Sequence, residues 1–145
     1  MPDNTNLIPE GIPGDGLDDF TIAYIECMLW SSTDNTDENT GGDPLDKNYS
    51  IDDIAPEAMT KIVADCERFQ RENATLLAEA EYNSSRSREW SKEELAGHDF
   101  WLTRVGHGCG FWDRDLGEVG DKLTEAAKKF GEVWPYVGDD GKIYV

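Results

Sequence analysis

The chain has 145 residues, and its 31 acidic side chains against 13 basic ones give a formal net charge of −18. Its length suits one domain, 1–145, with one hydrophobic core, and a hydrophobic content of 38% with five tryptophans excludes a chain that is disordered throughout. The negative charge opposes direct binding to nucleic acid or to anionic membranes. The sequence has no run of about 18 apolar residues and no signal-peptide pattern, so we expect a cytoplasmic protein.

Acidic residues are concentrated in the first two-fifths of the chain. Residues 1–57 hold 14 acidic side chains and a single basic one. Residues 1–16 contain three prolines and three glycines, which predict an extended arm. Apolar side chains then recur at steps of three and four, and this spacing predicts a helix over residues 17–31.

Residues 31–49 are predicted to form an acidic loop, because they lack periodicity and are rich in residue types that favour turns. The frame beginning at Asp37 places Asn48 where a calcium-binding loop needs a bidentate glutamate, so we expect no calcium site. The carboxylates here and just beyond are instead candidates for binding a basic surface of a protein partner. They are Asp34, Asp37, Glu38, Asp43, Asp46, Asp52 and Asp53.

A second helix is predicted from Pro56 to Ala80, because proline suits a first helical turn and apolar side chains follow at alternating steps of three and four. Asn73 lies on this apolar stripe. Packing on the rest of the domain explains the stripe most simply, and a homodimeric coiled coil with Asn73 on its seam is the alternative. The three cysteines have no paired spacing and are expected to be reduced thiols.

The C-terminal part, residues 97–145, is predicted to form a hairpin–helix–hairpin unit. FWLTRV at 100–105 and FWDRD at 111–115 alternate as strands do and flank a glycine-rich turn. Helical spacing returns over 116–130, and residues 133–145 predict a second hairpin. The order of elements predicts an α+β fold, in which an antiparallel sheet of about four strands is covered by about three helices.

The stretch from Gly97 to Asp115, GHDFWLTRVGHGCGFWDRD, holds both histidines and is the first place to look for chemistry. Cys109 could serve as a nucleophile only if its pKa fell, and the surrounding negative charge raises it. An extended 100–105 segment has ends roughly 17 Å apart, too far for the flanking histidines to share one ion, so we expect no metal site. We expect no cofactor either. The candidate acid–base residues are His98, Asp99, His107 and Asp113.

The aromatic residues of the same stretch are predicted to form a structural motif. Adjacent side chains of a strand point to opposite faces, so at least one aromatic of each pair is expected to be buried. In either hairpin register Arg104 faces an aromatic ring, which favours stacking of its guanidinium on that ring. The motif comprises Phe100, Trp101, Arg104, Phe111 and Trp112.

The long central stretch, with IECMLWSSTD, NYSIDDIAPEA and YVGDDGKIY, resembles a family of small acidic proteins encoded by tailed bacteriophages and prophages. The similarity covers most of residues 20–145. The family has a small residue where Cys109 stands here, which weighs against a catalytic cysteine. The resemblance implies a phage product that acts inside a bacterium, and it implies no reaction.

These observations together favour an interaction protein over an enzyme. We expect a phage accessory factor that binds a host protein with a basic surface and modulates it, in host takeover or counter-defence. Its acidic surface would imitate the charge of nucleic acid. The alternative is a small hydrolase or nucleotide-binding protein that uses the segment from His98 to Asp113.

Overall fold

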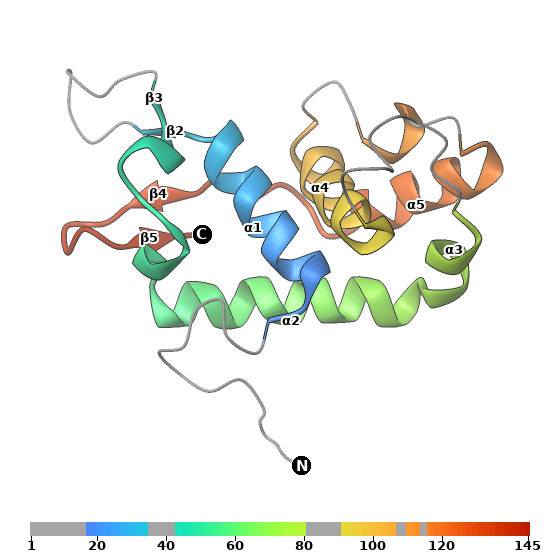
Figure 1. Cartoon of the computed structure of the whole chain (residues 1–145), viewed down its shortest axis with the longest axis horizontal. Helices are drawn as coiled ribbons and strands as arrows, with labels where there is room; N and C mark the ends of the chain where they lie inside the picture. The colour runs from blue at the N-terminus through green and yellow to red at the C-terminus, as the bar shows by residue number, and fades with distance from the viewer. Residues whose placement is uncertain (1–16, 35–42, 81–90, 107–109, 114–115) are drawn as a thin grey trace, which may run out of the picture.

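The computed structural model describes residues 17–34, 43–80, 91–106, 110–113 and 116–145. Within these residues the chain forms five α-helices, and its β-structure is confined to two antiparallel pairs of two-residue strands (Figure 1). The predicted α+β fold with a sheet of about four strands and about three helices is therefore wrong, and the protein is mainly α-helical. The predicted arm, residues 1–16, lies outside the described residues.

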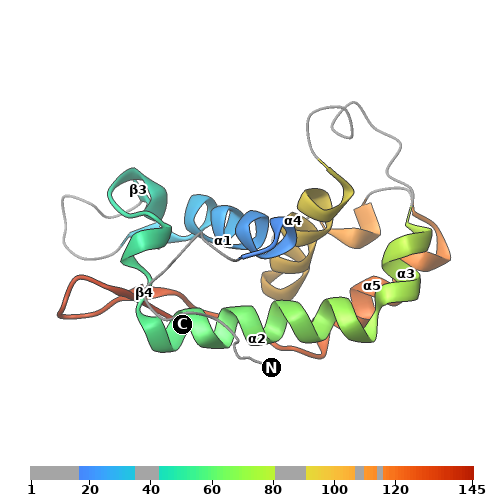
Figure 2. The same cartoon turned by 60° about the horizontal axis from the view of Figure 1, so that its bottom comes forward.

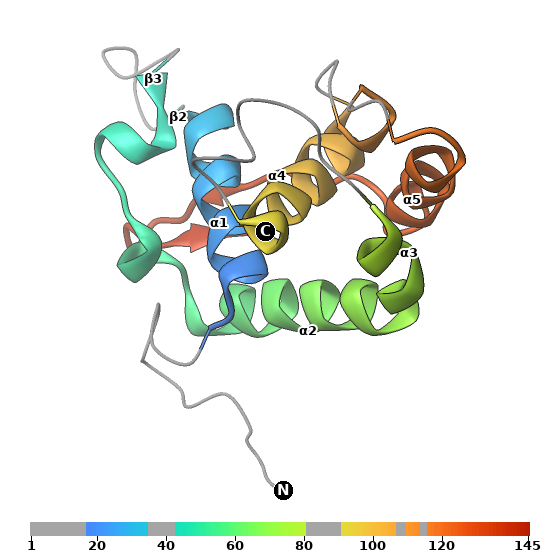
Figure 3. The same cartoon turned by 45° about the vertical axis from the view of Figure 1, so that its right-hand side comes forward.

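Helix α1 (Asp19–Ser31) is confirmed close to its predicted position of 17–31. The side chain of Asp18 caps its start by accepting a hydrogen bond from the backbone N–H of Thr21 at 2.8 Å. Eight of its 13 residues are buried, because α4 (Lys92–Val105) runs alongside it and α2 (Pro56–Glu72) crosses beneath both (Figures 1 and 3). Helix α1 is thus the central element of the core.

Helices α2 and α3 (Ala74–Glu79) replace the single helix predicted from Pro56 to Ala80. The break lies at Asn73, whose φ of −122° and ψ of 24° leave the helical region. Its side-chain amide donates to the backbone carbonyl of Phe69 at 2.9 Å, a local bond that competes with helix continuation. The predicted apolar stripe of α2 is confirmed, and its buried members are Ala58, Met59, Ile62, Cys66 and Phe69.

Helix α4 contradicts the strand predicted at residues 100–105 and, with it, the first hairpin of the predicted 97–145 unit. The helix begins with a capping box of Ser91 and Glu94 and continues through the whole aromatic run to Val105, with Gly106 as its C-cap. Ten of its 14 residues are buried. A helix buried on nearly every side carries no apolar stripe, so its short aromatic run has the same pattern as a strand.

Short elements complete the described chain. The closing hairpin is present as β4 paired with β5, and Ile143 of β5 also bridges Ile54 in parallel. Strands β2 and β3 give regular structure to the two ends of the predicted 31–49 loop. The bounds are β2 Thr33–Asp34, β3 Asp43–Pro44, η1 Leu45–Lys47, η2 Ile51–Asp53, η4 Phe111–Asp113, α5 Glu118–Lys128, β4 Tyr136–Val137 and β5 Ile143–Tyr144.

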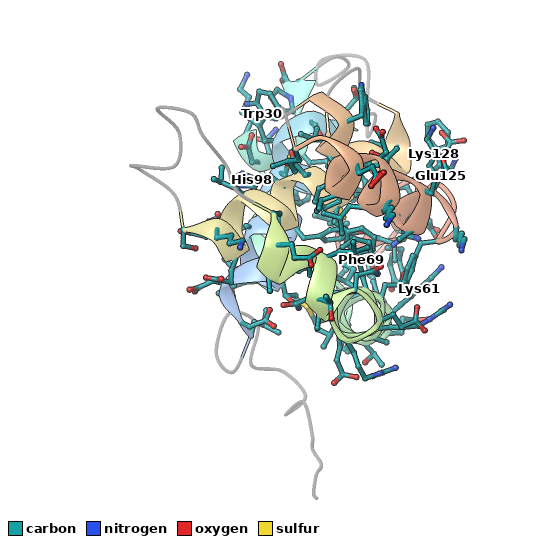
Figure 4. The ribbon with its side chains drawn as sticks, turned by 90° about the vertical axis from the view of Figure 1, so that its right-hand side faces the viewer. Trp30, Lys61, Phe69, His98, Glu125 and Lys128 are labelled. Carbon is teal, nitrogen blue, oxygen red and sulfur yellow. The ribbon has the colours of Figure 1, made fainter. Side chains whose placement is uncertain are left out.

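The core is built around aromatic rings from α1, α2, α4 and η4. Phe69 of α2 stacks on Phe100 of α4 with ring centroids 4.1 Å apart, and it lies 5.8 Å from Phe111 and 6.0 Å from Phe20. In Figure 4, Phe69 points from α2 towards the other helices, whereas Lys61 points away from them. Offset and edge-to-face ring contacts of this kind stabilise a core beyond the burial of apolar area.

The closest approach between helices occurs where Gly97 of α4 meets α1. A Cβ atom at Gly97 would clash with the backbone carbonyl of Phe20 and lie 3.2 Å from the Cβ of Ala23. The backbone of α1 cannot withdraw from this contact without disturbing the aromatic core behind it. Glycine is therefore required at position 97 by packing, at some cost in helix propensity.

We expect Gly97→Val to destabilise the protein by about 1–3 kcal/mol, because the added side chain forces α1 and α4 apart. Lys61→Val, at an exposed position in the middle of α2, is the matched control and should cost less than about 1 kcal/mol. Urea unfolding followed by circular dichroism measures both. Equal stability of the two variants would show that the α1–α4 contact is not closely packed.

Candidate functional site

The central stretch, where the sequence analysis placed the catalytic candidates, is largely core. His98 and Asp99 lie on α4 with exposed fractions of 8% and 1%, and both side chains have partners within the protein. His98 lies on the part of α4 seen in Figure 4. His107 and Cys109 lie outside the described residues, as does the side chain of Asp113. The structure therefore assigns a buried position to the two candidates that it describes.

The side chain of Arg104 donates four hydrogen bonds. Its Nη1 donates to Asp65 Oδ2 at 2.9 Å and to the Tyr24 hydroxyl at 3.2 Å. Its Nε and Nη2 donate to the backbone carbonyls of Gly131 and Phe130, both at 2.9 Å. The two carbonyls lie just beyond the C-terminus of α5, so the guanidinium binds the segment that follows that helix. One side chain thereby joins α1, α2, α4 and α5.

The predicted stacking of Arg104 on a ring is found, but with different partners. The hairpin registers placed its guanidinium against Phe111 or Trp112, whereas it lies 5.5 Å from the ring centroids of Phe100 and Phe130. Four residues separate Phe100 from Arg104 along one helix, which brings the two side chains together. Within the motif Phe100, Trp101 and Phe111 are fully buried, and Trp112 is 42% exposed.

Ionisable groups around Arg104 are held in unreactive forms. Burial raises the pKa of the Tyr24 hydroxyl well above its usual range, and the nearby Arg104 offsets this only in part. Burial likewise raises the pKa of the Cys66 thiol, so this cysteine is not a thiolate at neutral pH. A buried tyrosine, thiol and ion pair in this state form a structural network and not a set of acid–base groups.

The fold builds a second feature, an acidic end, from two segments far apart in sequence. The backbone N–H of Ala55 donates to the carbonyl of Ile143 at 2.9 Å, which fixes the β4–β5 hairpin against the segment before α2. Figures 1 and 2 show this hairpin beside η1 and η2, where α2 begins. We call this region the acidic end, and its carboxylates are Asp43, Asp46, Asp52, Asp53, Glu57, Asp139 and Asp140.

Most of the acidic end is open to solvent. Five of its seven carboxylate residues are exposed, whereas Asp43 and Asp53 are half-buried. Asp43 pairs with Lys47 at 3.2 Å, and Asp53 accepts a hydrogen bond from the backbone N–H of Ser50 at 2.8 Å. These two have local structural roles, so exposed residues such as Asp46 and Asp52 are the ones that present charge outward.

Only part of this surface was predicted from the sequence. Asp43, Asp46, Asp52 and Asp53 belong to it as described residues, whereas Asp37, Glu38 and the side chain of Asp34 lie outside them. Asp139, Asp140 and Glu57 were missed. Nothing in the local sequence indicates that a C-terminal hairpin pairs with residue 54, because that contact is made only in the folded chain.

One open cleft of about 270 Å³ lies where α3, the start of α4 and Phe20 meet. Its walls are mostly apolar, and its lysine is already engaged, since Lys92 Nζ donates to the carbonyl of Ala78 at 2.7 Å. That bond caps the C-terminal part of α3. Neither His98 nor Asp99 lines the cleft, so it does not expose the catalytic candidates.

Comparison with protein-family models, with curated proteins and with solved structures gave no match for this chain. Among the described residues, no three histidine, cysteine, aspartate or glutamate side chains gather as metal ligands would. Within the same residues, no helix has the length and apolar character needed to cross a membrane.

We expect Arg104→Ala to destabilise the protein by about 3–5 kcal/mol, because it leaves Asp65 and the backbone carbonyls of Phe130 and Gly131 without their donor. Arg71→Ala is the matched control, since Arg71 forms an exposed pair with Glu67 on α2 and should cost less than about 1 kcal/mol. Chemical denaturation compares the two. A cost for Arg104→Ala no greater than that of the control would refute the role of Arg104 as a junction.

A second prediction concerns Tyr144, whose hydroxyl donates to Asp140 Oδ2 at 2.7 Å. This bond favours the neutral phenol and raises the pKa of Tyr144 to about 12. Replacement of the carboxylate in Asp140→Asn removes the anionic acceptor, so the pKa should fall towards the ordinary tyrosine value of about 10. NMR titration of labelled tyrosine rings measures it, and an unchanged value would show that the bond is not formed in solution.

Proposed function

We propose that this protein is a bacteriophage product that binds a host protein with a basic surface and modulates it through the acidic end. The host setting rests on the sequence resemblance, and the mode of binding rests on charge. The observation that carries the proposal is the joining of residues 43–57 to the β4–β5 hairpin. This contact gathers seven carboxylates in a region whose basic side chains are Lys47 and Lys142.

Such a surface acts by attraction at a distance and by specific contacts after encounter. Clustered charge of one sign accelerates association with a surface of the opposite sign and discourages partners of the same sign. A basic groove that normally holds nucleic acid presents lysine and arginine to phosphates, and carboxylates can occupy the same positions. Because the acidic end lies on a separate region from Arg104 and its partners, it can vary without disturbing the core.

The contrast with the enzyme alternative supports this choice. A hydrolase needs polar side chains that converge in an accessible pocket. His98 and Asp99 are buried on α4 and do not line the cleft. Exposed carboxylates without a shared pocket suit binding better than turnover.

We expect reversal of three exposed charges of the acidic end, Asp46→Lys, Asp52→Lys and Asp139→Lys, to abolish capture of host proteins from bacterial lysate at low salt. The six-unit change in charge replaces attraction by repulsion. Capture by the original chain should also decline steeply as salt rises, because exposed charges are screened within about 8 Å at physiological ionic strength. Quantitative mass spectrometry of the captured proteins is the measurement.

The control carries the same charge change on the helices at the other end of the molecule in Figure 1, α3 and α5. It combines three exposed positions, Glu79→Lys, Asp121→Lys and Glu125→Lys. Retained capture by this control and loss with the acidic-end variant would support the proposal. Loss with both would assign binding to net charge alone, and retention by both would remove the acidic end from function.

A further inference from the structure

Two large aromatic side chains are exposed beside the acidic end. Trp134 is 75% exposed and Tyr136 is 57% exposed, whereas most of the described aromatic side chains are buried or half-buried. Neighbouring residues alternate with them, since Val133 is buried and Val137 is half-buried. Residues two apart on an extended segment share a face, so Trp134 and Tyr136 project from the same side of the chain.

The β4–β5 hairpin extends this aromatic face. Tyr136 is the cross-strand partner of Tyr144, and their rings stack with centroids 5.7 Å apart and planes 20° apart. Tyr144 is held in turn by its hydroxyl bond to Asp140. The ring of Tyr144 also packs over Gly138, where a Cβ atom would lie 2.6 Å from its Cε1. Both tyrosine rings are therefore fixed before any ligand arrives.

The charge around this aromatic face points to a cationic occupant. Asp139 and Asp140 lie in the loop that joins its strands, and Glu132 precedes Trp134 by two residues. Glu57 lies close enough to Tyr144 for its negative charge to help raise the pKa of the Tyr144 hydroxyl. Against these four carboxylates the hairpin carries one basic side chain, Lys142. A second copy of a chain with a net charge of −18 would meet repulsion here.

We propose that Trp134 and Tyr136 form a docking surface for a basic protein segment that presents arginine. A guanidinium stacks flat on an exposed aromatic ring, and its remaining N–H groups reach carboxylates at the edge of that ring. Arginine is favoured over lysine, because only its planar group can stack and make a two-pronged contact with a carboxylate together. The inference rests on the proposed function and names the side chain that the partner presents.

The test uses two synthetic peptides, one alternating arginine with glycine and the other alternating lysine with glycine. Isothermal titration measures their binding to the full chain and to Trp134→Ala and Tyr136→Ala. We expect the arginine peptide to bind the full chain more tightly than the lysine peptide, and each substitution to weaken it by about tenfold. Both residues are exposed, so the variants should fold, and circular dichroism checks this.

Trp30→Ala is the matched control, because Trp30 is 64% exposed at the end of α1 away from α2 (Figure 4). Its loss should leave peptide affinity unchanged. Equal loss with Trp30→Ala, or equal affinity for the two peptides, would overturn the inference. Unchanged affinity in Trp134→Ala and Tyr136→Ala together with lost affinity in the acidic-end charge reversal would overturn it and leave the proposed function standing.

Two further results would also count against an arginine-bearing partner at Trp134 and Tyr136. Concentration-dependent dimerisation of the full chain in sedimentation, abolished by Trp134→Ala, would assign the aromatic face to a second copy and overturn the inference. Binding of neither peptide at low salt would also overturn it. The lysate capture with the charge-reversed chain tests the proposed function separately, because that variant keeps both Trp134 and Trp30.

Discussion

A guanidinium taken out of water costs several kcal/mol unless its donors are paired, and Arg104 meets this requirement with groups from three other parts of the fold. Its side chain is 3% exposed and reaches Asp65 on α2, Tyr24 on α1 and the carbonyls that follow α5. These partners are in place only when the helices have assembled around α4. The cost of burying the charge therefore selects one arrangement of the helices.

The aromatic core and the Arg104 network depend on each other. Phe100 and Phe130 flank the guanidinium, and Phe100 also stacks on Phe69 of α2. The close passage of α1 past Gly97 brings Tyr24 within reach of Arg104. Packing and the Arg104 network therefore explain the aromatic, glycine and arginine residues of the central stretch, and catalysis is not needed to explain them.

The buried core and the charged surface lie in different parts of the molecule. The side chains that suggest chemistry, His98 and Asp99, are enclosed by packing, whereas the exposed carboxylates stand around the β4–β5 hairpin. Coulombic attraction between exposed groups needs no pocket and tolerates variation in individual residues. A binding role therefore fits the acidic end, and rings at Trp134 and Tyr136 can add contacts that charge alone does not supply.

The sequence predicted those elements whose signals are local. Helix α1, the apolar stripe of α2 and the closing β4–β5 hairpin were each indicated by the pattern of neighbouring residues. The strand assigned to residues 100–105 was wrong, because a helix buried all round has no polar face to reveal its period. The Ala55–Ile143 contact spans 88 positions and leaves no local trace, so the acidic end could be predicted only in part.

Hydrogen exchange with mass spectrometry, on the chain alone and in complex with a captured host protein, distinguishes a packed central stretch from a binding surface. We expect slow exchange across α4 in both states, because its amides lie in the packed core. We also expect new protection in the complex over residues 43–57 and 134–144. New protection concentrated in α4 and η4, with the acidic end unchanged, would show that the partner binds the central stretch and not the acidic end.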